Sequence, residues 1–205
     1  MTVDIPLLVA INQFAQASPW LHEPMKILSN YGVIAVLFTL LWAGAVWLAR
    51  RRPDPAVMAA ALWVPMAVAL GTLVKASVSG AVGEVRPCRA LPAIVAIGKC
   101  SKSLSFPSNH SVIAGAAAVG LLLVTRGLVS WLAAAAALAI GFSRVYLGLH
   151  YPHDVVAGLL IGGAVSVIGW FAVRAVLTRA VTGLLGTGLR PLLTSAAPES
   201  EPAYR

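Results

Sequence analysis

Long apolar runs separated by short polar segments occupy most of the 205-residue chain. A membrane-spanning helix needs about 20 apolar residues in succession, and five runs reach or approach that length. They are Tyr31–Ala49, Pro55–Val74, Leu104–Thr125, Gly127–Phe142 and Val155–Val173. The fourth run is short and rich in alanine, and the third begins with polar residues, so both are weaker spans than the first two. The pattern predicts an all-helical, polytopic membrane bundle of five to six transmembrane helices.

Shorter amphipathic stretches flank these spans. In Pro6–Gln16, apolar residues recur at helical spacing but polar residues interrupt them, which is typical of an interfacial or re-entrant helix. The stretch Ala175–Leu193 has a similar pattern with a basic edge, and predicts an amphipathic C-terminal helix. Residues 195–205 are polar and predict a disordered tail. Gly158 and Gly162 form a small-xxx-small pattern that favours close packing of helices within one chain.

Composition strengthens the membrane interpretation. Hydrophobic residues make up 59% of the chain and charged residues 11%, and the mean hydropathy is +0.86. Soluble domains are about half apolar and about one quarter charged. The chain is therefore neither disordered nor an ordinary soluble protein. The formal net charge is +8, and the charged residues lie between apolar runs. This placement indicates anionic lipids and phosphate substrates as partners, and no nucleic acid.

The basic residues do not decide the orientation alone, because eight lie in one set of loops and seven in the other. We place Arg50–Arg52 in the cytoplasm. Most of the opposite set is concentrated in the loop Lys75–Lys102 and its edges, where a basic cluster suits anion binding. Cys88 and Cys100 lie in this loop, on a side that permits disulfides. Both a disulfide and two unpaired thiols are compatible with the sequence.

Three short polar segments fall on this same side of the membrane. They are Glu84–Pro87, Ser105–His110 and Ser143–Asp154. Ser108 follows a proline and precedes an apolar run, as a helix N-cap does. The free N–H groups of the helix N-terminus attract an anion, and His110 lies in that first turn. This segment therefore predicts a phosphate site with a proton donor beside it.

The third segment supplies a nucleophile and cations. Asp154 follows His150 by four residues and can hydrogen-bond one ring nitrogen, which leaves the other free to attack. Arg144 and Arg86 each offer a planar fork for phosphate oxygens. Near these segments the carboxylates are Glu84 and Asp154, too few for a two-metal site. The segments together predict metal-free phosphoryl transfer.

These residues resemble the type 2 phosphatidic acid phosphatase (PAP2) superfamily. Its three motifs are Lys-x6-Arg-Pro, Pro-Ser-Gly-His and Ser-Arg-x5-His-x3-Asp. The third matches at Ser143, Arg144, His150 and Asp154. The second matches at Pro107, Ser108 and His110, with Asn109 in place of glycine. The first matches at Arg86 and Pro87 only, and its nearest lysine, Lys75, lies about one helical turn too early. That wide spacing resembles the bacitracin-resistance type of undecaprenyl pyrophosphate phosphatase.

The resemblance implies a single PAP2-type membrane domain over residues 1–194 and a set of site residues. His150 attacks the terminal phosphorus to form a phosphohistidine, His110 protonates the leaving oxygen, and Asp154 orients His150. The implied substrate-binding residues are Lys75, Arg86, Pro107, Ser108, Asn109, Ser143 and Arg144. The resemblance implies no cofactor and no metal.

The reaction implied is hydrolysis of undecaprenyl or another polyprenyl pyrophosphate to the monophosphate at the outer face of the cell membrane. That activity would recycle the lipid carrier of cell-wall synthesis and underlies bacitracin resistance. Phosphatidylglycerol phosphate, phosphatidate and a polyprenyl-phosphosugar phosphate stay open as substrates. A non-catalytic transporter or scaffold on the same fold is the alternative from another class. The lipid chain length and the oligomeric state are left undetermined.

Overall fold

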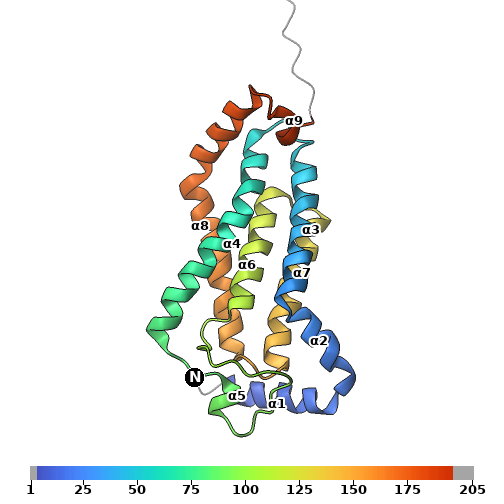
Figure 1. Ribbon diagram of the computed structural model, residues 1–205, viewed down its shortest axis with the longest axis vertical. Coiled ribbons are helices and arrows are strands. Elements are labelled where there is room, and N and C mark those ends of the chain that lie inside the picture. Colours follow the sequence, from blue (N-terminus) through green and yellow to red (C-terminus); the bar gives the residue numbers. More distant parts are fainter. Residues whose placement is uncertain (1–3, 196–205) are drawn as a thin grey trace, which may run out of the picture.

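The computed structural model describes residues 4–195 of the chain, and these fold into helices joined by loops and turns (Figure 1). The elements are α1 Asp4–Ala17, η1 Pro19–Leu21, α2 His22–Leu28, α3 Tyr31–Ala49, α4 Pro55–Val82, α5 Pro87–Ala90, α6 Asn109–Val124, α7 Leu128–Tyr146, α8 Pro152–Leu185 and α9 Arg190–Leu193. The predicted tail, 195–205, lies outside the described residues except for Ser195. The backbone N–H of Ser195 donates to the carbonyl of Arg50 at 2.7 Å.

Helix α6 forms the centre of the bundle and packs against α4, α7 and α8 (Figure 1). It is rich in alanine and glycine, and most of its residues are buried. Helix α3 packs on the outside of α4 and also contacts α6 and α7. Short loops join α3 to α4, α6 to α7 and α7 to α8, so these successive helices are antiparallel. Residues far apart in the sequence therefore meet at each end.

Small residues bring α6 and α8 into close contact. A Cβ atom on Gly162 would lie 2.1 Å from the carbonyl oxygen of Val112, and one on Gly158 would lie 2.8 Å from that of Ser108. Neither position has room for a side chain. The prediction that this pattern serves packing within one chain is confirmed.

Four helices within residues 4–195 are long and apolar enough to cross a membrane, namely α3, α4, α7 and α8. Helix α6, the third predicted span, has 16 residues and a length of ~24 Å. The polar start of that run forms a loop, which shortens the helix. Since α6 is enclosed by α4, α7 and α8, its neighbours rather than lipid cover most of its surface.

Helices α4 and α8 are longer than predicted. Helix α4 continues to Val82 rather than ending at Val74, and its C-cap, Gly83, has a φ of 68°. Helix α8 has 34 residues and a length of ~51 Å. The predicted separate C-terminal helix over Ala175–Leu193 is wrong, since its first part continues α8 without a break. Residues 174–182 contain neither glycine nor proline, so nothing in that stretch interrupts the helix.

The two ends of the bundle differ. One end carries α1, α2, α5 and the loop 91–108, while the other carries α9 and the loop between α3 and α4 (Figure 1). Helix α1 lies across the first end, where Leu8 and Ala15 are fully buried. Cys88 and Cys100 form a disulfide within the loop region of this end. The alternative of two unpaired thiols is therefore wrong.

Candidate active site

The three predicted segments meet at the end that carries α1 and α5. His150 and Asp154 occupy the turn into α8 and its first helical turn, Arg144 the last turn of α7, and His110 the first turn of α6. Arg86 immediately precedes α5. All five side chains are at least nine-tenths buried. The bundle thus places two histidines, two arginines and a carboxylate in one protected site.

Asp154 orients the proposed nucleophile. Its Oδ2 lies 3.1 Å from Nδ1 of His150. The same oxygen accepts hydrogen bonds from the backbone N–H of Tyr151 at 2.9 Å and from the hydroxyl of Ser105 at 2.5 Å. The Tyr151 contact belongs to the N-terminal cap of α8. This one oxygen atom therefore orients His150, caps the N-terminus of α8 and anchors the loop before α6.

Arg86 contacts the other nitrogen of His150. Its Nη1 lies 3.0 Å from His150 Nε2 and 3.1 Å from the carbonyl of Leu149, while Nε donates to the carbonyl of Ser103 at 3.0 Å. Because a guanidinium only donates, His150 Nε2 accepts, and Nδ1 carries the proton that binds Asp154. This tautomer leaves the Nε2 lone pair facing the cations, as nucleophilic attack on a phosphate requires.

The charge environment keeps His150 neutral. Burial, together with the positive charges of Arg86 and Arg144, lowers the pKa of His150 to about 4, although the contact with Asp154 opposes this shift. Burial also lowers the pKa of Arg86 from its usual value, while the charge of Asp154 opposes that shift. A neutral imidazole is the form with a free lone pair, so the site favours the nucleophilic state.

His110, in the first turn of α6, packs against the start of α3. Its Nε2 lies 3.0 Å from the carbonyl of Ser29, and its ring stacks on Tyr31 with 3.9 Å between ring centroids. A carbonyl only accepts, so this nitrogen carries a proton. The hydroxyl of Ser29 is also hydrogen-bonded to Nη1 of Arg144. The residues just before and at the start of α3 thus position two of the predicted site residues.

The start of α6 has the geometry of an anion site. Ser108 is its N-cap and fully buried, and its hydroxyl has no hydrogen-bond partner among residues 4–195. Pro107 precedes it, and the amide of Asn109 donates to the hydroxyl of Tyr31 at 3.1 Å. A buried hydroxyl and free backbone N–H groups beside two arginines can together hold phosphate oxygens.

Two predicted substrate ligands are placed differently. The hydroxyl of Ser143 donates to the carbonyl of Ile140 at 2.6 Å, within α7, so it is already engaged there. Lys75 lies on α4 and makes no hydrogen bond or ion pair with any residue in the described part of the chain. Its part in the site stays a prediction.

Sequence reasoning missed the partners that hold the site residues. Ser29 and Tyr31 lie far from every motif, and Ser103 and Ser105 lie in an irregular loop. Ser105 begins the predicted segment Ser105–His110, but its contact with Asp154 was not predicted. The others became recognisable only when the fold brought them to the motifs.

Comparison with known proteins agrees with this geometry. Residues 56–178, which carry all three motifs, match the PAP2 superfamily. The chain belongs to the PAP2 superfamily. It is thus a multi-pass membrane protein of the lipid phosphate phosphatase type, and the family predicted from its motifs is confirmed.

Several PAP2 relatives are similar over most of the chain. Decaprenylphosphoryl-5-phosphoribose phosphatase of Mycobacterium tuberculosis is 31% identical over 80% of this chain and 88% of its own length. An undecaprenyl-diphosphatase of Sulfolobus acidocaldarius is 29% identical over 80% of this chain and 74% of its own. The crystal structure of a PAP2-type phosphatidylglycerolphosphate phosphatase from Bacillus subtilis has a TM-score of 0.57 and 24% identity, covering 87% of this chain and 84% of that one. The last likeness confirms the all-helical PAP2 fold.

Proposed function

We propose that this PAP2 protein hydrolyses a polyprenyl pyrophosphate, undecaprenyl pyrophosphate in particular, to the monophosphate at the outer face of the cell membrane. The observation that carries the proposal is the His150–Asp154 pair, with Nε2 of His150 turned toward Arg86. In the proposed reaction this lone pair attacks the terminal phosphorus and forms a P–N bond. The bond to the bridging oxygen breaks, and the doubly protonated form of His110 gives that oxygen a proton and becomes neutral.

The second half of the reaction regenerates the enzyme. Water attacks the phosphohistidine, His110 takes the proton from that water, and inorganic phosphate leaves while the electron pair of the P–N bond returns to His150. Arg86, Arg144 and the hydroxyl of Ser108 bind the equatorial oxygens, whose charge rises in the transition state.

An apolar cavity beside the site supports a lipid substrate. It has a volume of ≈ 510 Å³ and lies between α3, α4 and α6. Its lining includes Ile34, Phe38, Trp42 and Val64, with Tyr31 at the end nearest the site. Since the ring of Tyr31 stacks on His110, a chain that fills this cavity would present its headgroup to the histidines.

A second candidate keeps the lipid and changes the headgroup. The Mycobacterium tuberculosis relative named above acts on a decaprenylphosphoryl phosphoribose, and its identity with this chain is as high as that of the diphosphatase. A polyprenyl-phosphosugar phosphate would place its terminal phosphate in the same anion site. We therefore include it as the second substrate class.

The disulfide supports the proposed orientation. Cys88–Cys100 lies at the end that carries the site, and disulfides persist outside the reducing cytoplasm. At the opposite end, Arg50, Arg51, Arg52 and Arg126 lie in the loops between the long helices, which is compatible with a cytoplasmic side.

The test is phosphate release by the purified, detergent-solubilised protein in excess EDTA. Undecaprenyl pyrophosphate, a polyprenyl-phosphosugar phosphate, phosphatidylglycerol phosphate and phosphatidate are offered in parallel, with His150→Ala as the control. Preference for the pyrophosphate, lost in the variant, supports the proposal. Preference for the sugar phosphate selects the second candidate, and preference for a glycerophospholipid overturns both. A folded protein that releases phosphate from none of them indicates a non-catalytic role.

A further inference from the structure

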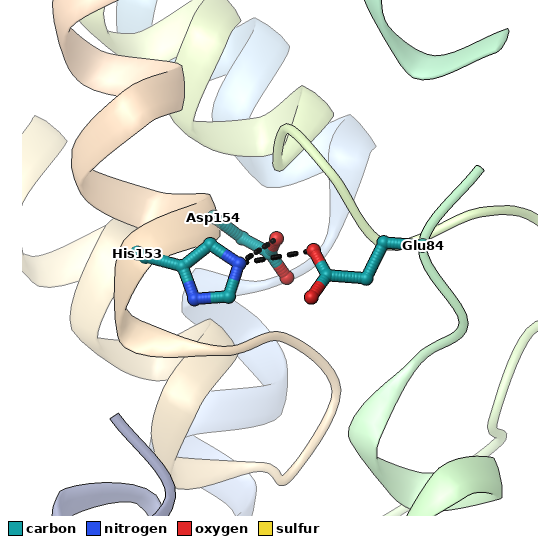
Figure 2. Close-up of side chains that lie close together, drawn as sticks. All are labelled: Glu84, His153 and Asp154. Carbon is teal, nitrogen blue, oxygen red and sulfur yellow. Dashed lines mark hydrogen bonds and ion pairs between the residues drawn. The ribbon is translucent and has the colours of Figure 1, made fainter. Parts of the chain in front are cut away.

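A second group of titratable side chains meets Asp154 on the side away from His150, and the proposed reaction uses none of its other members, Asp4, Glu84 and His153. Figure 2 shows His153, Asp154 and Glu84 turned toward one another. Nε2 of His153 lies 2.9 Å from a carboxylate oxygen of Glu84 and 3.5 Å from Oδ1 of Asp154. The other ring nitrogen, Nδ1, is hydrogen-bonded to Asp4 of α1. Two helices, α1 and α8, and the loop before α5 thus meet at one imidazole.

The two oxygens of Asp154 have very different surroundings. Oδ2 accepts from His150, Tyr151 and Ser105. Oδ1 is fully buried and has no hydrogen-bond partner in the described chain. Buried carboxylate oxygens are rarely left without a partner, and this one faces the space beside His153 and Glu84 (Figure 2). An unused lone pair in that position points to a ligand.

The charge of the cluster also favours a cation. Three carboxylates surround one imidazole, so negative charge remains in excess even when that imidazole is protonated. The side chains of Glu84 and His153 are mostly buried, with 17% and 28% exposure. Water therefore screens this excess less than it would at an open surface.

We propose that Glu84, His153 and Asp154 bind a divalent transition-metal ion, with Zn²⁺ as the ion of choice. One potential ligand atom from each residue lies within 4.8 Å of the others. One imidazole nitrogen and two carboxylate oxygens, with water as the fourth ligand, suit tetrahedral Zn²⁺. The contact between Asp4 and Nδ1 of His153 matches the carboxylate that usually orients a zinc-bound histidine.

The bound ion would inhibit the neighbouring site, an effect that rests on the proposed function. Asp154 serves both sites through different oxygens, Oδ1 toward the metal and Oδ2 toward His150. A metal on Oδ1 withdraws electron density from the carboxylate and weakens its hydrogen bond to Nδ1 of His150. Nε2 then becomes a poorer nucleophile. Changes to such an outer partner cost about 10- to 100-fold, so we expect Zn²⁺ to lower kcat by ~10-fold or more.

Binding is tested without hydrolysis. The full chain, purified without a histidine tag and stripped with EDTA, is titrated with Zn²⁺ alone by calorimetry, in the His150→Ala background. Glu84→Gln keeps the shape of the side chain and removes one ligand charge. Glu23→Gln is the matched control, because Glu23 is 75% exposed and, within residues 4–195, forms its ion pair with Lys26. We expect one Zn²⁺ per chain, with the Kd raised at least ~10-fold by Glu84→Gln and unchanged by Glu23→Gln.

Circular dichroism and gel filtration confirm that each variant is folded before it is titrated. The proposal is overturned if the chain binds no stoichiometric Zn²⁺, or if Glu84→Gln binds it as tightly as the control. Phosphate release with and without Zn²⁺ then tests inhibition, which Glu84→Gln should relieve and Glu23→Gln should not. A failed substrate assignment would appear as absent turnover in EDTA, while the calorimetric result stands on its own.

Discussion

At the scale of single residues, the site depends on a histidine that stays neutral in a cationic pocket. Burial, followed by the charges of Arg86 and Arg144, lowers the pKa of His150 to about 4, and the contact with Asp154 opposes them. A nucleophile with a lowered pKa is active above that pKa and loses activity as the pH falls through it. We therefore expect the acid limb of kcat/KM, measured in EDTA, to lie below the value of 6.5 for an ordinary histidine.

The substitution Arg86→Gln tests whether this acid limb reports the titration of His150 or that of the substrate. Removing the positive charge lets the pKa of His150 rise, so the acid limb should move to higher pH while the maximal rate falls. The substrate is the same for both enzymes and cannot produce a shift between them. An acid limb at the same pH in wild type and variant would show that His150 is not the group that titrates.

At the scale of elements, the glycines between α6 and α8 hold the site together. Gly162→Ala would push a Cβ atom to 2.1 Å from the carbonyl of Val112, and such overpacking costs about 1–3 kcal/mol. We expect a lower unfolding temperature in detergent. Gly183→Ala, on the same helix with nothing within 4 Å of the new Cβ, should leave it unchanged or raise it, since alanine favours a helix over glycine. Equal effects of the two substitutions would contradict this packing argument.

Helix α3 contributes the wall of the lipid cavity. Ala35→Phe fills part of this space. Displacing about two methylene groups of a bound chain costs about 1.6 kcal/mol, or roughly tenfold in kcat/KM. Val36→Phe is the control, because Val36 is 61% exposed and lies outside the cavity lining. We expect Ala35→Phe to slow hydrolysis of a long-chain substrate and to spare a water-soluble phosphate ester. A loss shared by both substrates would place the effect on the site rather than on the cavity.

The helices and their contacts also show which parts of the structure the sequence alone can predict. Apolar runs predicted the long helices, because each must bury or cover its side chains, and motif order predicted the meeting of His110, Arg144 and His150 at one end. The continuation of α8 past Val173 was missed, since a basic edge resembles an amphipathic helix whether or not a break precedes it. Ser29 was missed because a serine before a helix is common, and only the fold brings it to His110 and Arg144.

At the scale of the whole molecule, the two ends of the bundle are chemically distinct, and this difference predicts the orientation. One end has the disulfide and the site, and the other has Arg50–Arg52 and Arg126. The basic residues are almost evenly divided between the two ends, so the disulfide decides the expectation: with Arg50–Arg52 inside, Cys88 and Cys100 face an oxidising environment. A chain inserted the other way would hold Cys88 and Cys100 in a reducing compartment.

Cysteine labelling on intact cells measures this orientation. Lys26→Cys places a thiol on exposed α2 at the site end, and Arg126→Cys places one in the loop between α6 and α7 at the other. A membrane-impermeant maleimide should label the first and not the second, whereas both should react after the membrane is permeabilised. The reverse pattern would place the site in the cytoplasm. Turnover of substrate in the outer leaflet would then require the lipid headgroup to cross the membrane first, so this labelling also decides which leaflet supplies the enzyme.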